Sequence, residues 1–168
     1  MRKLLLVALL VGAAAPVWAA EEPSGCDKFK WSIDHERAVL TAPDRVKLNS
    51  GSDVAAMPST GITLSLVAPS DAKLPSPPER APKDGTTAGF ASFKGTPKAG
   101  TYTISLSSGA WVDVVQNGQF LKPKAFSGAT DCDGIRKTMK YELSDKPFVL
   151  QVSGTKDNSI SIAILPTE

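Results

Sequence analysis

The residues that could bind a metal ion are few, because the chain contains a single histidine, His35. His35 and Glu36 begin like the zinc motif H-E-x-x-H, but Val39 stands where that motif has its second metal-binding histidine. The run 131–134 (DCDG) lacks the further carboxylates that a calcium loop requires. We therefore predict no metal site and no cofactor. His35 is expected at the surface of a short helix, and residues 131–134 are expected to form a tight turn.

Serine chemistry is suggested only by two short matches to the pattern S-x-x-K. Ser70 with Lys73 and Ser153 with Lys156 have this spacing, which brings both side chains to one helix face in penicillin-recognising enzymes. The first pair lies in a proline-rich segment and the second in an expected hairpin turn, so neither is expected on a helix. We predict no catalytic residue, although a site that forms only in the folded chain stays open.

A candidate binding site lies in one of the expected strands. Trp111 and Asp113 share one face of this strand, and Val112 and Val114 share the other. If the valines face the core, an exposed indole lies beside a carboxylate. With the nearby cation Arg136, this group could bind a sugar or a peptide. The alternative is a core tryptophan, with Asp113 paired to Arg136 at a sheet end.

Two cysteines, Cys26 and Cys132, are present. In an oxidising compartment a lone pair of cysteines usually forms one bridge, and nothing here resembles the redox motif C-x-x-C. We predict a disulfide between Cys26 and Cys132, which would close a loop of about 100 residues. Two free or redox-active thiols are the alternative.

The expected elements begin with a short amphipathic helix at 31–42, for which Ser32 is the expected N-cap and Pro43 the stop. Residues 68–85 are expected to form an extended surface loop, because their prolines exclude both a helix and a central strand: Pro69, Pro75, Pro77, Pro78 and Pro82.

Period-two alternation predicts about eight or nine short strands in the rest of the chain. They are expected at 45–48, 61–67, 88–93, 100–106, 111–116, 119–122, 135–143, 148–152 and around 160–164. Asn117-Gly118 is typical of a two-residue hairpin turn. Each sheet would have one apolar face, so two sheets must cover each other. The predicted fold is all-β, an antiparallel β-sandwich such as a jelly roll with one short N-terminal helix, and a closed barrel is the alternative.

The first residues are typical of a cleaved secretory signal. Arg2 and Lys3 precede an apolar run that is too short to span a bilayer, and Val17-Trp18-Ala19 places small residues where a signal peptidase reads them. We predict a signal peptide at 1–19, cleaved after Ala19 or alternatively after Ala20, and one sandwich domain at 20–168. Lipidation is the competing interpretation, but residues 20–25 separate the cleavage site from Cys26.

The charge of the exported part excludes some partners. The chain has 19 basic and 17 acidic residues, and removal of Arg2 and Lys3 leaves 17 of each. A protein with a net charge near zero lacks the electrostatic footprint of a nucleic-acid or anionic-membrane binder. No later run is long enough to span a membrane. We therefore expect a periplasmic or secreted protein that does not bind nucleic acid.

Several segments resemble a family of small secreted proteobacterial proteins of unknown function. The segments are 26–31 (CDKFKW), 36–38 (ERA), 78–83 (PERAPK), 109–118 (GAWVDVVQNG) and 132–137 (CDGIRK). The order of Ala99-Gly100-Thr101-Tyr102, the Trp111 strand and the segment 148–154 is also similar to a bacterial pre-peptidase C-terminal domain. That second resemblance implies a non-catalytic β-sandwich of the kind appended to secreted enzymes.

Relatives of the first family often carry the label homogentisate 1,2-dioxygenase. That chemistry needs iron held by two histidines and a carboxylate, and one chain with His35 alone cannot build this site. We expect instead an exported, non-enzymatic protein that binds or accompanies another envelope component, either a protein or a carbohydrate or peptide ligand. A small secreted hydrolase-like enzyme is the alternative.

The signal peptide yields the first testable prediction. Protein recovered from the periplasm of an expressing bacterium should begin at Ala20, because the small residues before that position fit the peptidase. N-terminal sequencing and intact mass measure this directly. The variant Ala19→Arg should retain the precursor mass. A chain that begins at a lipid-modified Cys26 would contradict the prediction.

Overall fold

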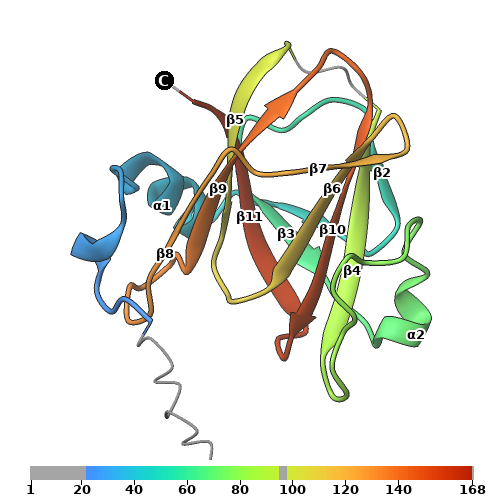
Figure 1. Cartoon of the computed structure of the whole chain (residues 1–168), viewed down its shortest axis with the longest axis horizontal. Coiled ribbons are helices and arrows are strands. Elements are labelled where there is room, and N and C mark those ends of the chain that lie inside the picture. The colour runs from blue at the N-terminus through green and yellow to red at the C-terminus, as the bar shows by residue number, and fades with distance from the viewer. Residues whose placement is uncertain (1–21, 95–97, 168) are drawn as a thin grey trace, which may run out of the picture.

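The chain folds into two β-sheets that pack face to face, with a short helix on the outer side of one of them (Figure 1). The computed structural model describes residues 22–94 and 98–167. Eleven strands lie in these residues. The predicted signal peptide, 1–19, lies outside them. Within the described ranges, no helix combines the length and the apolar character needed to cross a bilayer.

The helical elements are η1 (Cys26–Lys28), α1 (Asp34–Thr41) and α2 (Pro69–Ala72). The strands, in chain order, are β1 (Val46–Leu48), β2 (Ser52–Val54), β3 (Ile62–Ser65), β4 (Thr87–Phe93), β5 (Gly100–Leu106), β6 (Trp111–Gln116), β7 (Gln119–Leu121), β8 (Ala125–Gly128), β9 (Lys137–Leu143), β10 (Phe148–Thr155) and β11 (Ser159–Pro166).

The sandwich is confirmed, but its pairing is not wholly antiparallel. One sheet has the strand order β1-β3-β11-β5-β9-β8 and the other has β2-β4-β10-β6-β7. The pairs β1–β3 and β2–β4 are parallel, while the remaining pairs are antiparallel. Consecutive strands β1 and β2 enter different sheets. The connections from β1 to β3 and from β2 to β4 are long enough for the chain to return and add each later strand in the parallel direction.

The core lies between the sheets and is built from the alternating apolar positions. Inward residues of the central strands, such as Leu150 on β10 and Ile162 on β11, are each 1% exposed. Phe93 and Phe148 stack with ring centroids 4.7 Å apart. The alternating apolar residues of segments 62–66, 102–106, 139–143, 148–152 and 160–164 all belong to this one cluster, as the period-two pattern predicts.

A second, smaller core lies on the outer face of the first sheet. Ala163 and Leu165 of β11 pack there against Ile33 and Leu40, which come from the region of α1. Trp31 is half-buried beside them, and the Lys140 ammonium lies 4.8 Å from its ring centroid. This second cluster explains why β11 is apolar on both of its faces.

Three local expectations were wrong. The first helix begins at Asp34, and its N-cap is Ile33 rather than Ser32. The proline-rich segment contains one helical turn, α2, because Pro69 occupies the first helical position, where no backbone N–H is needed. Strands β2 and β8 were not predicted, since their short sequences show no apolar alternation.

The rest of the proline-rich segment lies across the outer face of the second sheet, and we call residues 74–83 the strap. The Gln151 side chain on β10 accepts a hydrogen bond from the Ser76 backbone N–H at 3.0 Å and donates one to the Ser76 carbonyl at 3.1 Å. Ser76 stands between Pro75 and Pro77, which have no N–H to satisfy. The Gln151 side chain therefore holds the strap through the kind of backbone hydrogen bonds that a neighbouring strand would otherwise have formed.

The predicted disulfide is confirmed between Cys26 and Cys132, which are 106 residues apart in the sequence. The bridge ties the N-terminal segment to the turn that precedes β9. Backbone bonds reinforce the same connection, since the Gly25 N–H donates to the Thr130 carbonyl and the Thr130 N–H donates to the Pro23 carbonyl, each at 2.8 Å.

Removal of the bridge should lower the free energy of unfolding by about 4–5 kcal/mol, because a closed loop of this length restricts the unfolded chain strongly. Denaturant titration of the double variant Cys26→Ser/Cys132→Ser measures this loss. Reductant should lower the free energy of unfolding of the wild-type protein by a similar amount and leave that of the double variant unchanged. Equal unfolding midpoints for the two proteins would contradict the prediction.

Candidate functional site

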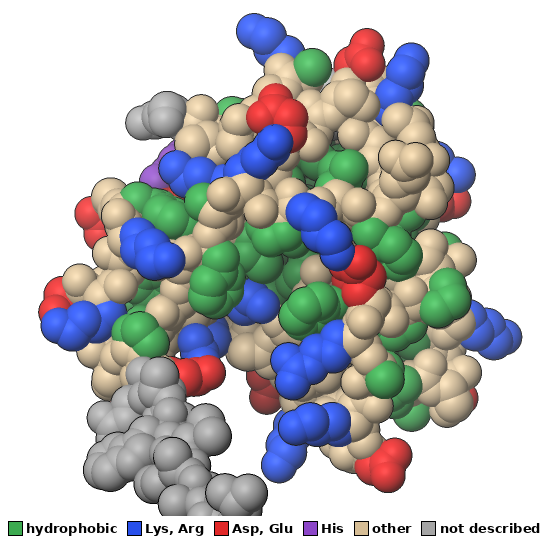
Figure 2. Space-filling model, in the orientation of Figure 1, with side chains coloured by type: hydrophobic (Ala, Val, Ile, Leu, Met, Phe, Trp, Pro, Cys, Tyr) green, Lys and Arg blue, Asp and Glu red, His purple; other side chains and the backbone are tan. Residues whose placement is uncertain are grey.

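The main cleft lies where the two sheets separate along one side of the sandwich. Strands β6 and β7 of one sheet and β8 and β9 of the other border it, and residues 122–124 cross between the sheets there. Its volume is about 620 Å³. Hydrophobic and basic side chains gather around this hollow over the middle of the molecule (Figure 2).

The inner wall of the cleft is apolar. Val112 of β6 and Met139 and Tyr141 of β9 line it, and all three belong to the core between the sheets. The Tyr141 hydroxyl donates to the Met139 sulfur at 3.9 Å, and burial raises the pKa of Tyr141. The phenol therefore remains uncharged at physiological pH. The wall offers ring and aliphatic contact rather than charge.

Trp111 borders the cleft at the start of β6, and its indole is held in place by Asp113. The indole Nε1–H donates to Asp113 Oδ1 at 2.8 Å, and the backbone N–H of Glu79 in the strap donates to Oδ2 at 3.2 Å. The strap covers Asp113, which is 3% exposed, and this burial raises its pKa. Asp113 thus orients Trp111 and anchors the strap, and it does not face the cleft.

The three predicted binding residues therefore separate into two groups. Trp111 and Arg136 line the cleft together, and Asp113 lies beneath the strap. The predicted alternative, a core tryptophan with Asp113 paired to Arg136, is not what the structure shows. Trp111 is half-buried at the outer side of its sheet, and Arg136 pairs with Glu22. The binding role of these residues stays a prediction.

Basic side chains surround the cleft. Its lining contains Arg80, Lys83, Lys122, Arg136 and Lys137, against the acidic Glu22 and Glu79. Glu79 pairs with Lys122, and Glu22 pairs with Arg136. Among the described residues, the other three cations have no ion pair. The Arg80 guanidinium lies 5.8 Å from the centroid of the Trp111 ring and makes a cation–π contact with it.

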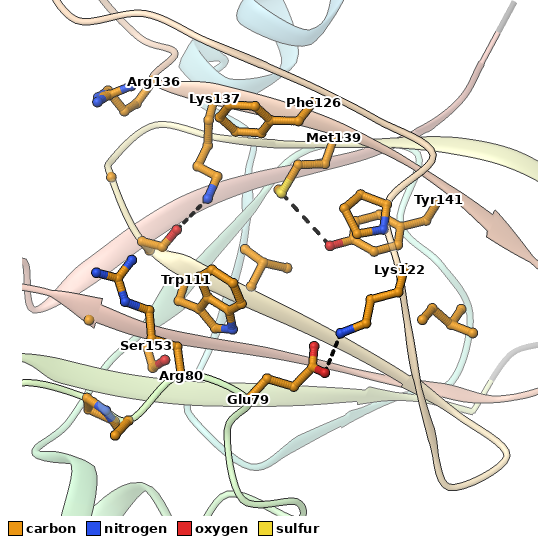
Figure 3. A pocket seen from close by; sticks show the side chains of 18 of the residues that line it. Glu79, Arg80, Trp111, Lys122, Phe126, Arg136, Lys137, Met139, Tyr141 and Ser153 are labelled. Carbon is orange, nitrogen blue, oxygen red and sulfur yellow. Dashed lines mark hydrogen bonds and ion pairs between the residues drawn. The ribbon is translucent and has the colours of Figure 1, made fainter. Parts of the chain in front are cut away.

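Lys137 is the most unusual of these cations, because its position on β9 points it inward (Figure 3). Its Nζ donates to the Ala110 carbonyl at 2.6 Å and lies 5.6 Å from the centroid of the Phe126 ring. Burial, together with repulsion from Arg136 and Arg80, lowers the pKa of Lys137 to about 8. The ammonium is therefore charged at neutral pH in a place that disfavours the charge.

Sequence reasoning missed Lys137, although a signal existed. Lys137 shares the strand face of Met139, Tyr141 and Leu143, so the alternation places a lysine in a row of core residues. Arg80 carried no comparable signal. It lies in the strap, and only the folded chain brings it over Trp111.

Of the other motifs, His35 and the turn at 133–134 are located as expected from the sequence. The two S-x-x-K serines are not, because Ser70 lies on the helical turn α2 and Ser153 lies within strand β10. His35 is exposed on α1, and residues 133–134 form a turn beside the disulfide. Ser70 and Lys73 are exposed around α2, while Ser153 lines the cleft and Lys156 is exposed in the turn after β10. Within the described residues, no group of three or more histidine, cysteine or acidic side chains could hold a metal ion.

No family model, curated protein or solved structure matches this chain.

Lys137 should titrate in a pH range that separates it from ordinary lysines, whose pKa is about 10.4. NMR of ¹³C-labelled lysine side chains should show one resonance with a midpoint near pH 8, and this resonance should be absent in Lys137→Arg. Because the folded pKa lies below the unfolded value, the free energy of unfolding should rise as pH increases from about 8 to 10.5. A midpoint above pH 10 for Lys137 would contradict the assignment.

Proposed function

We propose that this chain is an exported, non-enzymatic β-sandwich protein of the periplasm or cell exterior that binds another envelope component in the cleft between β6–β7 and β8–β9. The observation that carries the proposal is the cleft itself. Its volume of about 620 Å³ lies within the range of ligand sites, and it combines an apolar wall with a few convergent polar groups.

The aromatic side chains support a binding role. Trp111 is held by its indole hydrogen bond to Asp113, and Phe126 at the border of the cleft is 49% exposed. Large apolar groups that stay partly exposed beside a cleft are typical of recognition sites. The resemblance to small secreted proteins agrees with export, and the resemblance to the non-catalytic pre-peptidase C-terminal domain agrees with a non-enzymatic role.

The enzymatic alternatives have less support. Ring cleavage by mononuclear iron needs two histidines, and the chain has only His35. A serine hydrolase would need a nucleophile beside a base. Ser153 lines the cleft, but Lys156, its partner in the S-x-x-K pattern, is exposed in the turn between β10 and β11.

Site-specific photo-crosslinking tests the proposal in living cells. The full chain would carry p-benzoylphenylalanine in place of Phe126 at the cleft. A control would carry it in place of Val46, which is 38% exposed on β1, at the opposite edge of the same sheet as β8. We expect a defined adduct, seen as a discrete mass increase, from the Phe126 position alone.

The change Trp111→Ala in the Phe126 photo-probe protein should reduce this adduct at least about tenfold, since it removes the aromatic group that the other sheet contributes to the same cleft. The abundance of the protein in the periplasm serves as the control for folding. Identical adducts from both probe positions, or none from either, would overturn the proposal of a ligand-binding cleft.

A further inference from the structure

We infer that the cleft binds an acidic carbohydrate, whose carboxylate lies beside the Lys137 ammonium while a sugar ring packs against the aromatic border formed by Trp111 and Phe126. This inference rests on the proposed binding function and names the class of ligand for the same cleft. It depends on the charge of the cleft, on the mixture of donors and acceptors around it, and on the short strands that flank it.

The charge argument begins with Lys137. Of its three N–H donors, one is used by the Ala110 carbonyl, and no carboxylate of the described residues forms an ion pair with it. A half-buried ammonium without a counter-ion is costly, and the nearby Arg136 and Arg80 guanidiniums increase that cost. A carboxylate beside Nζ would offset both effects and accept charge-assisted hydrogen bonds. The ligand therefore carries a negative group at this position.

The rest of the cleft suits hydroxyl groups. Glu79 with Lys122 and Glu22 with Arg136 form two ion pairs in its lining, which present acceptors and donors side by side. Each sugar hydroxyl both donates and accepts hydrogen bonds, so it can use both members of such a pair. The C–H face of a sugar ring is apolar and fits the flat aromatic side chains at the cleft border. A ligand with an anionic group and several hydroxyls satisfies all of these surfaces.

A peptide fits less well, because the usual route for an extended peptide is to add a strand to a sheet edge. The two edges at the cleft, β7 and β8, are only 3 and 4 residues long. The N-terminal segment also occupies part of the β8 side, since the Lys30 N–H donates to Ser127 Oγ at 2.9 Å. Little free strand edge therefore remains for peptide pairing.

Isothermal titration calorimetry of the full chain, expressed in a disulfide-forming host, tests the inference. The probes are trisaccharides of galacturonic, glucuronic and mannuronic acid, the same trisaccharides with their carboxyl groups reduced to alcohols, and a tri-glutamate peptide. At least one uronic acid trisaccharide should bind, and about tenfold or more tightly than its reduced form, because the reduced sugar keeps the ring and loses the charge. Its affinity should also fall as salt is raised.

Two variants from one strand separate the local charge of the cleft from the net charge of the protein. Lys137→Met should weaken binding of the acidic trisaccharide about tenfold or more, and Lys137→Arg should restore part of it. Lys140→Met removes the same charge from the opposite face of β9, where Lys140 contacts Trp31, and should leave the affinity unchanged within about twofold. Thermal unfolding of each variant shows that it is folded.

Each other outcome overturns the inference in a recognisable way. Equal affinity for acidic and reduced trisaccharides would show that no charge is recognised. Tighter binding of tri-glutamate would identify an acidic peptide as the occupant. Equal losses of affinity for the acidic trisaccharide in Lys137→Met and Lys140→Met would show that only the net charge of the protein matters. If no probe binds while the Phe126 photo-probe still gives its adduct, the carbohydrate assignment fails and the proposed binding function stands.

Discussion

Exclusion of water from two apolar sheet faces is the constraint on which this structure depends. Most inward positions of the central strands are filled by a core side chain, and both sheets contribute to one cluster. The cleft forms where apolar side chains no longer fill the space between the sheets. Along the side bordered by β6–β7 and β8–β9 the inward row of β9 ends in Lys137 instead of another apolar residue, and the sheets separate around its ammonium. The cleft is thus an unfilled end of the core, which explains why its inner wall is apolar and its lining is charged.

The outer face of the second sheet follows a different principle. Asp113 and Gln151 occupy outward positions and are nonetheless 3% and 1% exposed, because the strap lies over them. Each of these side chains bonds to a strap backbone group, at Glu79 and Ser76 respectively. Burial of these polar side chains beneath the strap costs little, because the strap backbone supplies the hydrogen-bond partners that water would otherwise provide. Through Asp113 the same arrangement sets the position of Trp111, so the strap and the cleft share one anchoring residue.

Much of the fold was predictable from the sequence, and less of the site. The alternation of apolar and polar residues identified the inward strand faces correctly, as the burial of Ile62, Ile104 and Ile162 shows. The single pair of cysteines predicted the disulfide. The parallel pairs β1–β3 and β2–β4 were not predictable, because alternation within a strand carries no information about the direction of its neighbour. In the site, Trp111 was found because the alternation places it on the outward face of its strand. The environments of Asp113 and Arg136 depend instead on the strap and on Glu22. Contacts between segments so distant in the sequence leave no local pattern.

The placement of the last two strands has a consequence for how the molecule assembles. Strand β10 is the middle strand of one sheet, and β11 lies between β3 and β5 in the other. The early strands β3 and β4 therefore find their antiparallel partners only in the final part of the chain. Such distant pairing makes folding slow and leaves β3 and β4 without their antiparallel partners until the last strands are made. Neither sheet can be completed before synthesis is nearly finished. This delay suits the proposed export, because a translocation channel admits only unfolded chains.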